Sequence, residues 1–101
     1  MPLLLIRYQV AEKGVAEVIR ATEATFQAVR DEQPEGIRYL YLHRPGGNEF
    51  VALLELNQGL ENPLPGIEAA RHLQATVAQW VEGGAPTPQP LEVIGSYGFT
   101  R

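Results

Sequence analysis

The sequence predicts an α+β domain in which two strand–helix–strand units are joined by a hairpin. Three observations support this. Alternating or continuous apolar runs mark four strands, apolar residues at helical spacing mark two helices, and turn residues separate these segments. At 101 residues the chain is the size of one hydrophobic core. We therefore assign residues 1–101 to a single domain.

Residues 3–10 form the first predicted strand. They are apolar at both alternating sets of positions, which is typical of a central strand covered on both faces. From Glu12 the apolar period becomes that of an amphipathic helix packed on the sheet. We expect this helix to end near Glu32, because Pro34 disfavours helical geometry at the residue before it.

A hairpin follows, with strands at residues 37–43 and 48–56. Its turn is Arg44-Pro45-Gly46-Gly47, where Pro followed by Gly suits the central positions of a tight turn. The sequence is consistent with a register that places His43 opposite Asn48. A slip of one residue would move the side chains to the wrong faces.

The last third of the chain predicts a helix, a connector and a strand. An apolar stripe at helical spacing runs through residues 65–82, and Gly83-Gly84 ends it. Three prolines at alternate positions make residues 85–90 a stiff extended connector. Residues 91–99 alternate again and predict the final strand.

This element order is the split βαβ arrangement of the ferredoxin-like fold, a four-stranded antiparallel sheet with both helices on one face. We expect the other face to be apolar and to carry Leu3, Leu5, Ile37, Tyr39, Tyr41, Phe50, Leu54, Val93 and Tyr97. A monomer would leave too much apolar surface in water. The sequence therefore predicts a homodimer that packs sheet against sheet, the dimeric α+β barrel.

Charge and composition limit the kinds of binding partner and the cellular compartment that we expect. The formal net charge is -4 and no basic stripe is present, which disfavours nucleic acid and anionic membrane surfaces. The apolar start of the chain is interrupted by Arg7, well short of a signal-peptide core or a membrane span. The lack of cysteine fits a reducing compartment. Cytoplasm is the default expectation.

No motif for a metal, a nucleotide or a nucleophile is found. His43 and His72 lack the spacing of a zinc or iron site, and both Gly-Gly pairs belong to ends of elements rather than to a phosphate-binding loop. The chain has no cysteine, and Ser96 lies within the last predicted strand. We expect neither a metal nor a cofactor.

Several residues are candidates for chemistry, each with a structural alternative. Arg7 on a central strand needs either a carboxylate such as Glu55 or Glu92 or a water-containing cavity, because a buried unpaired charge is costly. His43 lies either at the mouth of a pocket or exposed at a strand end. The tyrosines of the hairpin line a cavity for a flat aromatic ligand or pack in a dimer interface.

The segments 36–44, 50–55 and 93–97 carry a family resemblance. They read GIRYLYLHR, FVALLE and VIGSY. With the element order of the whole chain, these segments resemble the antibiotic-biosynthesis-monooxygenase-like domains of the dimeric α+β barrel superfamily. They are patterns of fold rather than of catalysis.

The resemblance implies either a cofactor-independent oxygenase or a binder of small aromatic molecules. The haem-degrading members use an Asn on the first strand with a Trp and a later His. Here that strand carries Arg7 and Gln9, and Trp80 follows His72, so haem degradation is not expected.

The implied site lies in a cavity between helices and sheet, where an electron-rich phenol reacts directly with dioxygen. Arg7 would stabilise an oxyanion, His43 or a tyrosine would exchange the proton, and Tyr39 and Tyr41 would hold the substrate. The alternative is a non-catalytic dimeric structural or ligand-binding module, in which the aromatic face is only an interface.

Overall fold

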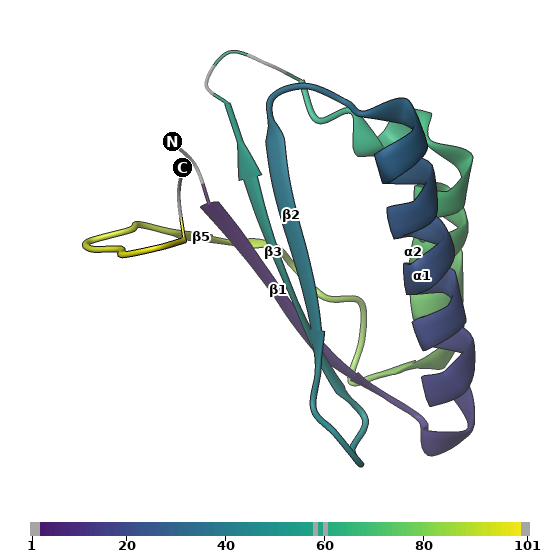
Figure 1. Cartoon of the computed structure of the whole chain (residues 1–101). Helices are drawn as coiled ribbons and strands as arrows, with labels where there is room; N and C mark the ends of the chain where they lie inside the picture. The colour runs from purple at the N-terminus through teal and green to yellow at the C-terminus, as the bar shows by residue number, and fades with distance from the viewer. Residues whose placement is uncertain (1–2, 58, 60, 100–101) are drawn as a thin grey trace.

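A computed structural model describes residues 3–57, 59 and 61–99 and places both helices on one side of a sheet (Figure 1). The elements in chain order are β1 (Leu3–Val10), the 3-10 helix η1 (Glu12–Gly14), α1 (Val15–Glu32), β2 (Ile37–His43), β3 (Glu49–Leu56), the 3-10 helix η2 (Leu64–Gly66), α2 (Glu68–Trp80), β4 (Val81–Glu82) and β5 (Gln89–Leu91). The predicted ferredoxin-like α+β fold is confirmed.

The sheet is antiparallel with the order β2-β3-β1-β4, and β5 also pairs with β1. β4 pairs with Gln9 and Val10, whereas β5 pairs with residues 3–5 of the same edge. Two short strands therefore share the fourth position of the sheet. Gly83 and Gly84, which have positive φ, and the proline-rich residues that follow separate β4 from β5.

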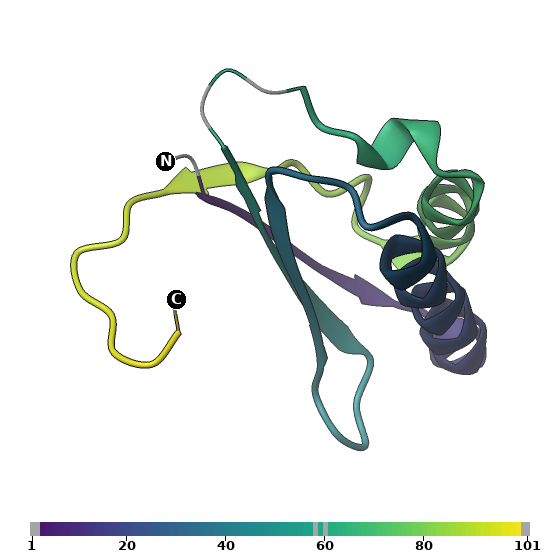
Figure 2. The same ribbon diagram turned by 45° about the horizontal axis from the view of Figure 1, so that its top comes forward.

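The predicted last strand at residues 91–99 is wrong over most of its length. β5 ends at Leu91, and residues 92–96 have no regular structure. We call residues 92–99 the C-terminal tail. It leaves the sheet on the side away from the helices (Figures 1 and 2). An alternating pattern does not produce a strand where no neighbouring strand of the same chain bonds to it.

The hairpin register differs from the expected one by two residues. His43 pairs with Phe50 rather than with Asn48, and Tyr41 pairs with Ala52. A shift of two residues leaves every side chain on its original face. The grouping of the hairpin side chains into two sets is therefore correct.

The assignment of these sets to the two faces of the sheet is wrong for the aromatic set. Because Tyr8 of β1 pairs with Phe50, the hairpin set that contains the tyrosines lies on the helix side. The residues expected on the opposite face that in fact face the helices are Ile37, Tyr39, Tyr41, Phe50 and Leu54. The pairing of β1 with β3 determines which set of hairpin side chains faces the helices. Periodicity within each strand does not contain this information.

The face of the sheet opposite the helices, called the open face below, has a different set of apolar residues. Leu5 pairs with Leu53, which pairs with Leu40, and side chains paired across strands share a face. The apolar residues of the open face are Leu3, Leu5, Leu40, Leu42, Val51 and Leu53. The prediction that Leu3 and Leu5 lie on the face opposite the helices is thus correct.

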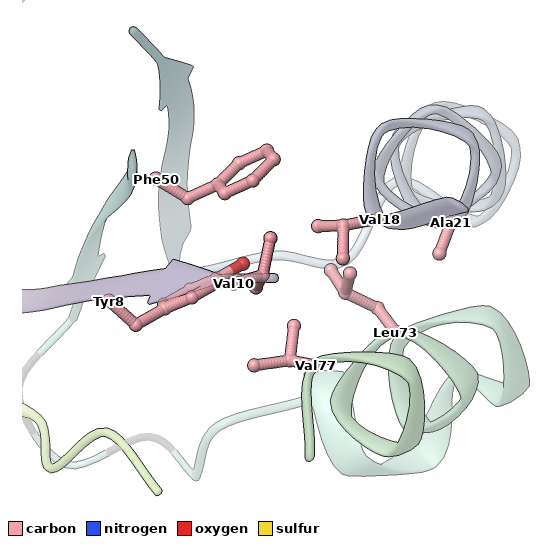
Figure 3. Packing of buried hydrophobic residues seen from close by; sticks show 7 residues of the cluster. All are labelled: Tyr8, Val10, Val18, Ala21, Phe50, Leu73 and Val77. Carbon is pink, nitrogen blue, oxygen red and sulfur yellow. The ribbon is translucent and has the colours of Figure 1, made fainter. Parts of the chain in front are cut away.

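The main core lies between the sheet and the two helices (Figure 3). It joins Tyr8, Val10 and Phe50 of the sheet to Val18 and Ala21 of α1 and Leu73 and Val77 of α2. Within the described residues, no helix is both long enough and apolar enough to cross a membrane.

Thr25 joins the two helices through its fully buried hydroxyl. Its oxygen lies 2.8 Å from the carbonyl oxygen of Ala21 and 3.1 Å from that of Ala69. The hydroxyl is therefore satisfied within α1 while it also contacts the first turn of α2. This contact keeps the helices close together at that level.

Trp80 closes the end of the core at the beginning of α1. Its indole ring packs directly over Gly14, its Nε1 donates to Glu17 Oε1 at 3.2 Å, and its carbonyl oxygen accepts from the Ala11 N–H at 2.9 Å. Glycine is required at position 14 because a Cβ there would overlap the indole ring.

We predict that Gly14→Ala lowers the free energy of unfolding by about 1 to 3 kcal/mol, the usual cost of overpacking a core. Urea denaturation measures this change. Gly66→Ala is the matched control, because a Cβ at Gly66 meets no atom within 4 Å. Equal stability of the two variants would show that Trp80 does not constrain this position.

Candidate functional site

A cavity of about 360 Å³ lies between the sheet and α2, and we call it the sheet–helix cavity. All three long strands, η2, α2 and the segment 85–88 contribute to its walls. Most of the lining is apolar and includes Leu4, Ile6, Ala52, Leu54, Leu64, Leu73 and Val77. The small side chains of Ala52 and Ala70 leave room that larger residues would fill.

Three tyrosines from two strands form the aromatic part of the wall. Tyr39 stacks on Phe26 of α1, with ring centroids 4.9 Å apart, and Tyr41 meets Tyr39 edge to face at 6.1 Å. The hydroxyl of Tyr41 is hydrogen-bonded to that of Tyr8. These contacts hold each ring in one orientation.

The three tyrosines are neutral at physiological pH. Burial raises the pKa of Tyr8 to about 12, even though its hydrogen bond to Tyr41 acts in the opposite direction. Burial, together with a neighbouring tyrosine, also raises the pKa values of Tyr39 and Tyr41. These hydroxyls therefore act as hydrogen-bonding groups and not as general bases.

The hydroxyl pair leaves one proton for a ligand. Two hydroxyls carry two protons, and the mutual bond between Tyr8 and Tyr41 uses one of them. The other O–H is able to donate to an acceptor placed in the cavity. The tyrosine cluster thus offers a neutral, oriented donor within an apolar wall.

Three exposed polar residues mark the mouth of the cavity. Asn62, Arg71 and Gln74 line it, and within the described part of the chain Arg71 is the one charged residue among the lining residues. Arg71 donates from a terminal nitrogen to the carbonyl oxygen of Pro65 at 2.7 Å. Asn62 Oδ1 accepts from the Leu64 N–H at 3.0 Å.

Arg7 does not line this cavity, because alternation along β1 directs it to the open face. Its side chain is exposed, and its Nε lies 2.5 Å from Glu49 Oε2, while Arg44 lies 3.1 Å from Glu49 Oε1. Two hydrogen bonds lower the pKa of Glu49, and the one from Arg7 has a larger effect than the one from Arg44. The structure thus pairs Arg7 with a carboxylate, but with Glu49 rather than with Glu55 or Glu92.

His43 lies at the end of β2. Its Nε2 is 2.8 Å from the Gly47 carbonyl oxygen, and its ring packs on Phe50 with centroids 4.6 Å apart. Arg7 and His43 both border a second, solvent-open hollow beside the hairpin. The four predicted site residues are therefore divided: Tyr39 and Tyr41 line the sheet–helix cavity, and the other two lie at this hollow.

The catalytic roles of Arg7 and His43 stay predictions. Tyr8 and Arg71, which both line the cavity, are not among the predicted site residues. Tyr8 shares an alternating set with Leu4 and Ile6, which was a usable signal. No feature of the sequence marks Arg71 as a site residue, because its position is typical of an ordinary exposed helix residue.

Within the described residues, no three His, Asp or Glu side chains gather where they could hold a metal ion.

Comparison with known proteins supports the fold. The crystal structure of L-rhamnose mutarotase FA22100 from Formosa agariphila matches with a TM-score of 0.52 and 14% sequence identity, over 94% of this chain and 97% of that chain. No protein-family model matches the sequence, and no curated protein matches it significantly. At this identity the likeness concerns the fold alone.

We predict that stability falls as the pH rises from about 10, the pKa of tyrosine in an unfolded chain, towards the value of about 12 for folded Tyr8. The pKa is raised on folding, so the stabilising contribution is complete below the unfolded pKa and is lost above it. Urea denaturation across this range measures the loss. Tyr41→Phe should make the decline shallower, and an equally steep decline in this variant would contradict the assignment.

Proposed function

We propose that this protein binds a small, largely aromatic molecule in the sheet–helix cavity. The observation that carries the proposal is the cavity itself, about 360 Å³ of mostly apolar space with a few polar groups in its lining. Small-molecule sites usually have this form and this range of size. The cavity also argues against the alternative of a module in which the aromatic residues serve only as an interface.

The aromatic class follows from the wall. Tyr39 and Tyr41 are held by ring contacts with Phe26 and with each other, so they present fixed ring surfaces. A flat ring gains from stacked or edge-to-face contact with such surfaces. A hydroxyl of the Tyr8–Tyr41 pair donates to an oxygen on the ligand.

Direct oxygenation of a phenol is the second candidate within this proposal, and the resemblance to antibiotic-biosynthesis-monooxygenase-like domains favours it. Protonated tyrosines are suited to stabilise a developing oxyanion. They are not suited to remove a proton, because their pKa values are raised. The substrate would therefore need an acidic proton that leaves to water at the mouth.

Sugar chemistry of the kind named for the rhamnose mutarotase is less compatible with this site. Opening a sugar ring requires a paired acid and base among polar contacts. The lining of the sheet–helix cavity is mostly apolar and includes no histidine or carboxylate within the described residues. We therefore favour an aromatic ligand over a sugar.

We predict that 2-naphthol raises the melting temperature of the wild-type protein in a concentration-dependent way, because a ligand bound to the folded state stabilises it by mass action. Ala52→Leu places extra atoms in the cavity and should abolish the shift. Ala75→Leu is the matched control, because Ala75 is exposed and lies outside the cavity. Equal shifts in both variants would place the ligand elsewhere.

The same proposal includes a homodimer formed through the open face. Leu40 and Leu42 are 48% and 47% exposed on the edge strand β2, beside Leu53 and Val51 of β3. Ion pairs flank these residues: Arg38 with Glu55 at one end and Arg7 with Glu49 at the other. Both signs of charge occur at each end, so the surface is complementary to a second copy related by a two-fold axis.

The C-terminal tail supports a second copy as the occupant of this face. Its side chains Ile94, Tyr97 and Phe99 are 96%, 96% and 85% exposed. The tail projects on the same side of the sheet as the open face (Figures 1 and 2). One partner lying on that side would cover both apolar surfaces, which a monomer would leave in water.

We predict that Leu42→Asp converts a wild-type dimer into a monomer in sedimentation velocity at micromolar concentration, because dimerisation would bury an unpaired carboxylate. Ala24→Asp, at an exposed position of α1, should leave the dimer intact. A wild-type protein that sediments as a monomer, or a Leu42→Asp variant that stays dimeric, would refute this interface.

A further inference from the structure

Among the arginines of the described residues, Arg71 is the one that lines the sheet–helix cavity. Arg7, Arg38 and Arg44 each have a carboxylate partner on the open face. Arg71 lies on α2 at the mouth of the sheet–helix cavity, and no ion pair with a carboxylate is found for it among the described residues. Its positive charge is therefore available to a ligand.

The position of its guanidinium is set by a backbone contact. One terminal nitrogen donates to the Pro65 carbonyl oxygen at 2.7 Å, which connects the side chain to η2 at the rim. This bond uses one of several N–H donors of the group, and the remaining donors can bind an anion. A planar guanidinium matches a carboxylate with two parallel hydrogen bonds.

The polar groups of the cavity lie on different elements, and the rest of the lining is mostly apolar. The Tyr8–Tyr41 hydroxyl pair belongs to the strands, whereas Arg71 belongs to the exposed surface of α2. A ligand that reaches from one to the other needs an apolar body and a charged end. Because Arg71 is exposed, that charged end would keep part of its hydration, and the desolvation cost of binding an ion stays small.

We infer that the ligand of the sheet–helix cavity is an aromatic anion whose carboxylate is bound by Arg71 at the mouth while its ring lies against the tyrosines. This inference rests on the proposed function and specifies its ligand class. Arg71 is then a specificity-determining residue that selects anionic over neutral aromatic molecules.

The test compares two probes of the same shape, 2-naphthoate and the neutral 2-naphthamide, by isothermal titration calorimetry. Wild-type protein should bind the naphthoate more tightly than the amide. Arg71→Gln should weaken naphthoate binding by about 10- to 100-fold, the range for a lost hydrogen bond to a charged group. The affinity for the amide should stay within about twofold, because the apolar contacts are unchanged.

Two further variants separate charge at the mouth from other effects. Arg30→Gln removes the same charge from an exposed position of α1 and should change neither affinity. Arg71→Lys keeps the charge without the planar geometry and should retain part of the preference for the naphthoate. Melting temperatures of all variants check that η2 remains folded after the bond to Pro65 is lost.

The outcomes are distinct. If wild-type protein binds the amide as tightly as the naphthoate, or if Arg71→Gln weakens both probes equally, the anionic ligand class is wrong and the aromatic cavity remains. If neither probe binds wild-type protein, both the proposed function and this inference are wrong.

Discussion

The two-sided strand β1 is the element on which the rest of the structure depends. It bonds to β3 along one edge and to β4 and β5 along the other. Its side chains alternate between the helix side, where Tyr8 and Val10 are buried, and the open face, where Arg7 is exposed. A central strand with both faces in use divides the molecule into two surfaces with different chemistry.

The two helices use the helix side of the sheet in different ways. α1 is held to α2 by Thr25 and to the tyrosine cluster by Phe26, so it completes the core and supports the rings. α2 contributes Leu73 and Val77 to the core, but it also lines the cavity opposite Ala52. Small residues on the facing elements are the physical reason that a cavity exists there, since close packing would otherwise fill the space.

The fold by itself does not define the chemistry. This chain aligns over 94% of its length with a rhamnose mutarotase structure at only 14% identity, so the likeness concerns the framework and not the side chains of the site. Protonated tyrosines and an exposed arginine provide hydrogen-bond donors of two strengths, one neutral and one charged. Under the proposed function, such a lining would recognise an oxygen-bearing ring, and any proton would have to be lost by the ligand itself.

Periodicity in the amino-acid sequence located β1, α1 and the hairpin almost to the residue, because burial of one face imposes a local repeat. It also grouped the side chains of the hairpin correctly. Periodicity could not show which group faces the helices, because this follows from the pairing of Tyr8 with Phe50 between distant segments. The position where β5 ends and the location of Arg71 at the cavity mouth could not be predicted from periodicity either. Both depend on contacts between distant segments, and a pattern within one segment cannot encode which partner it meets.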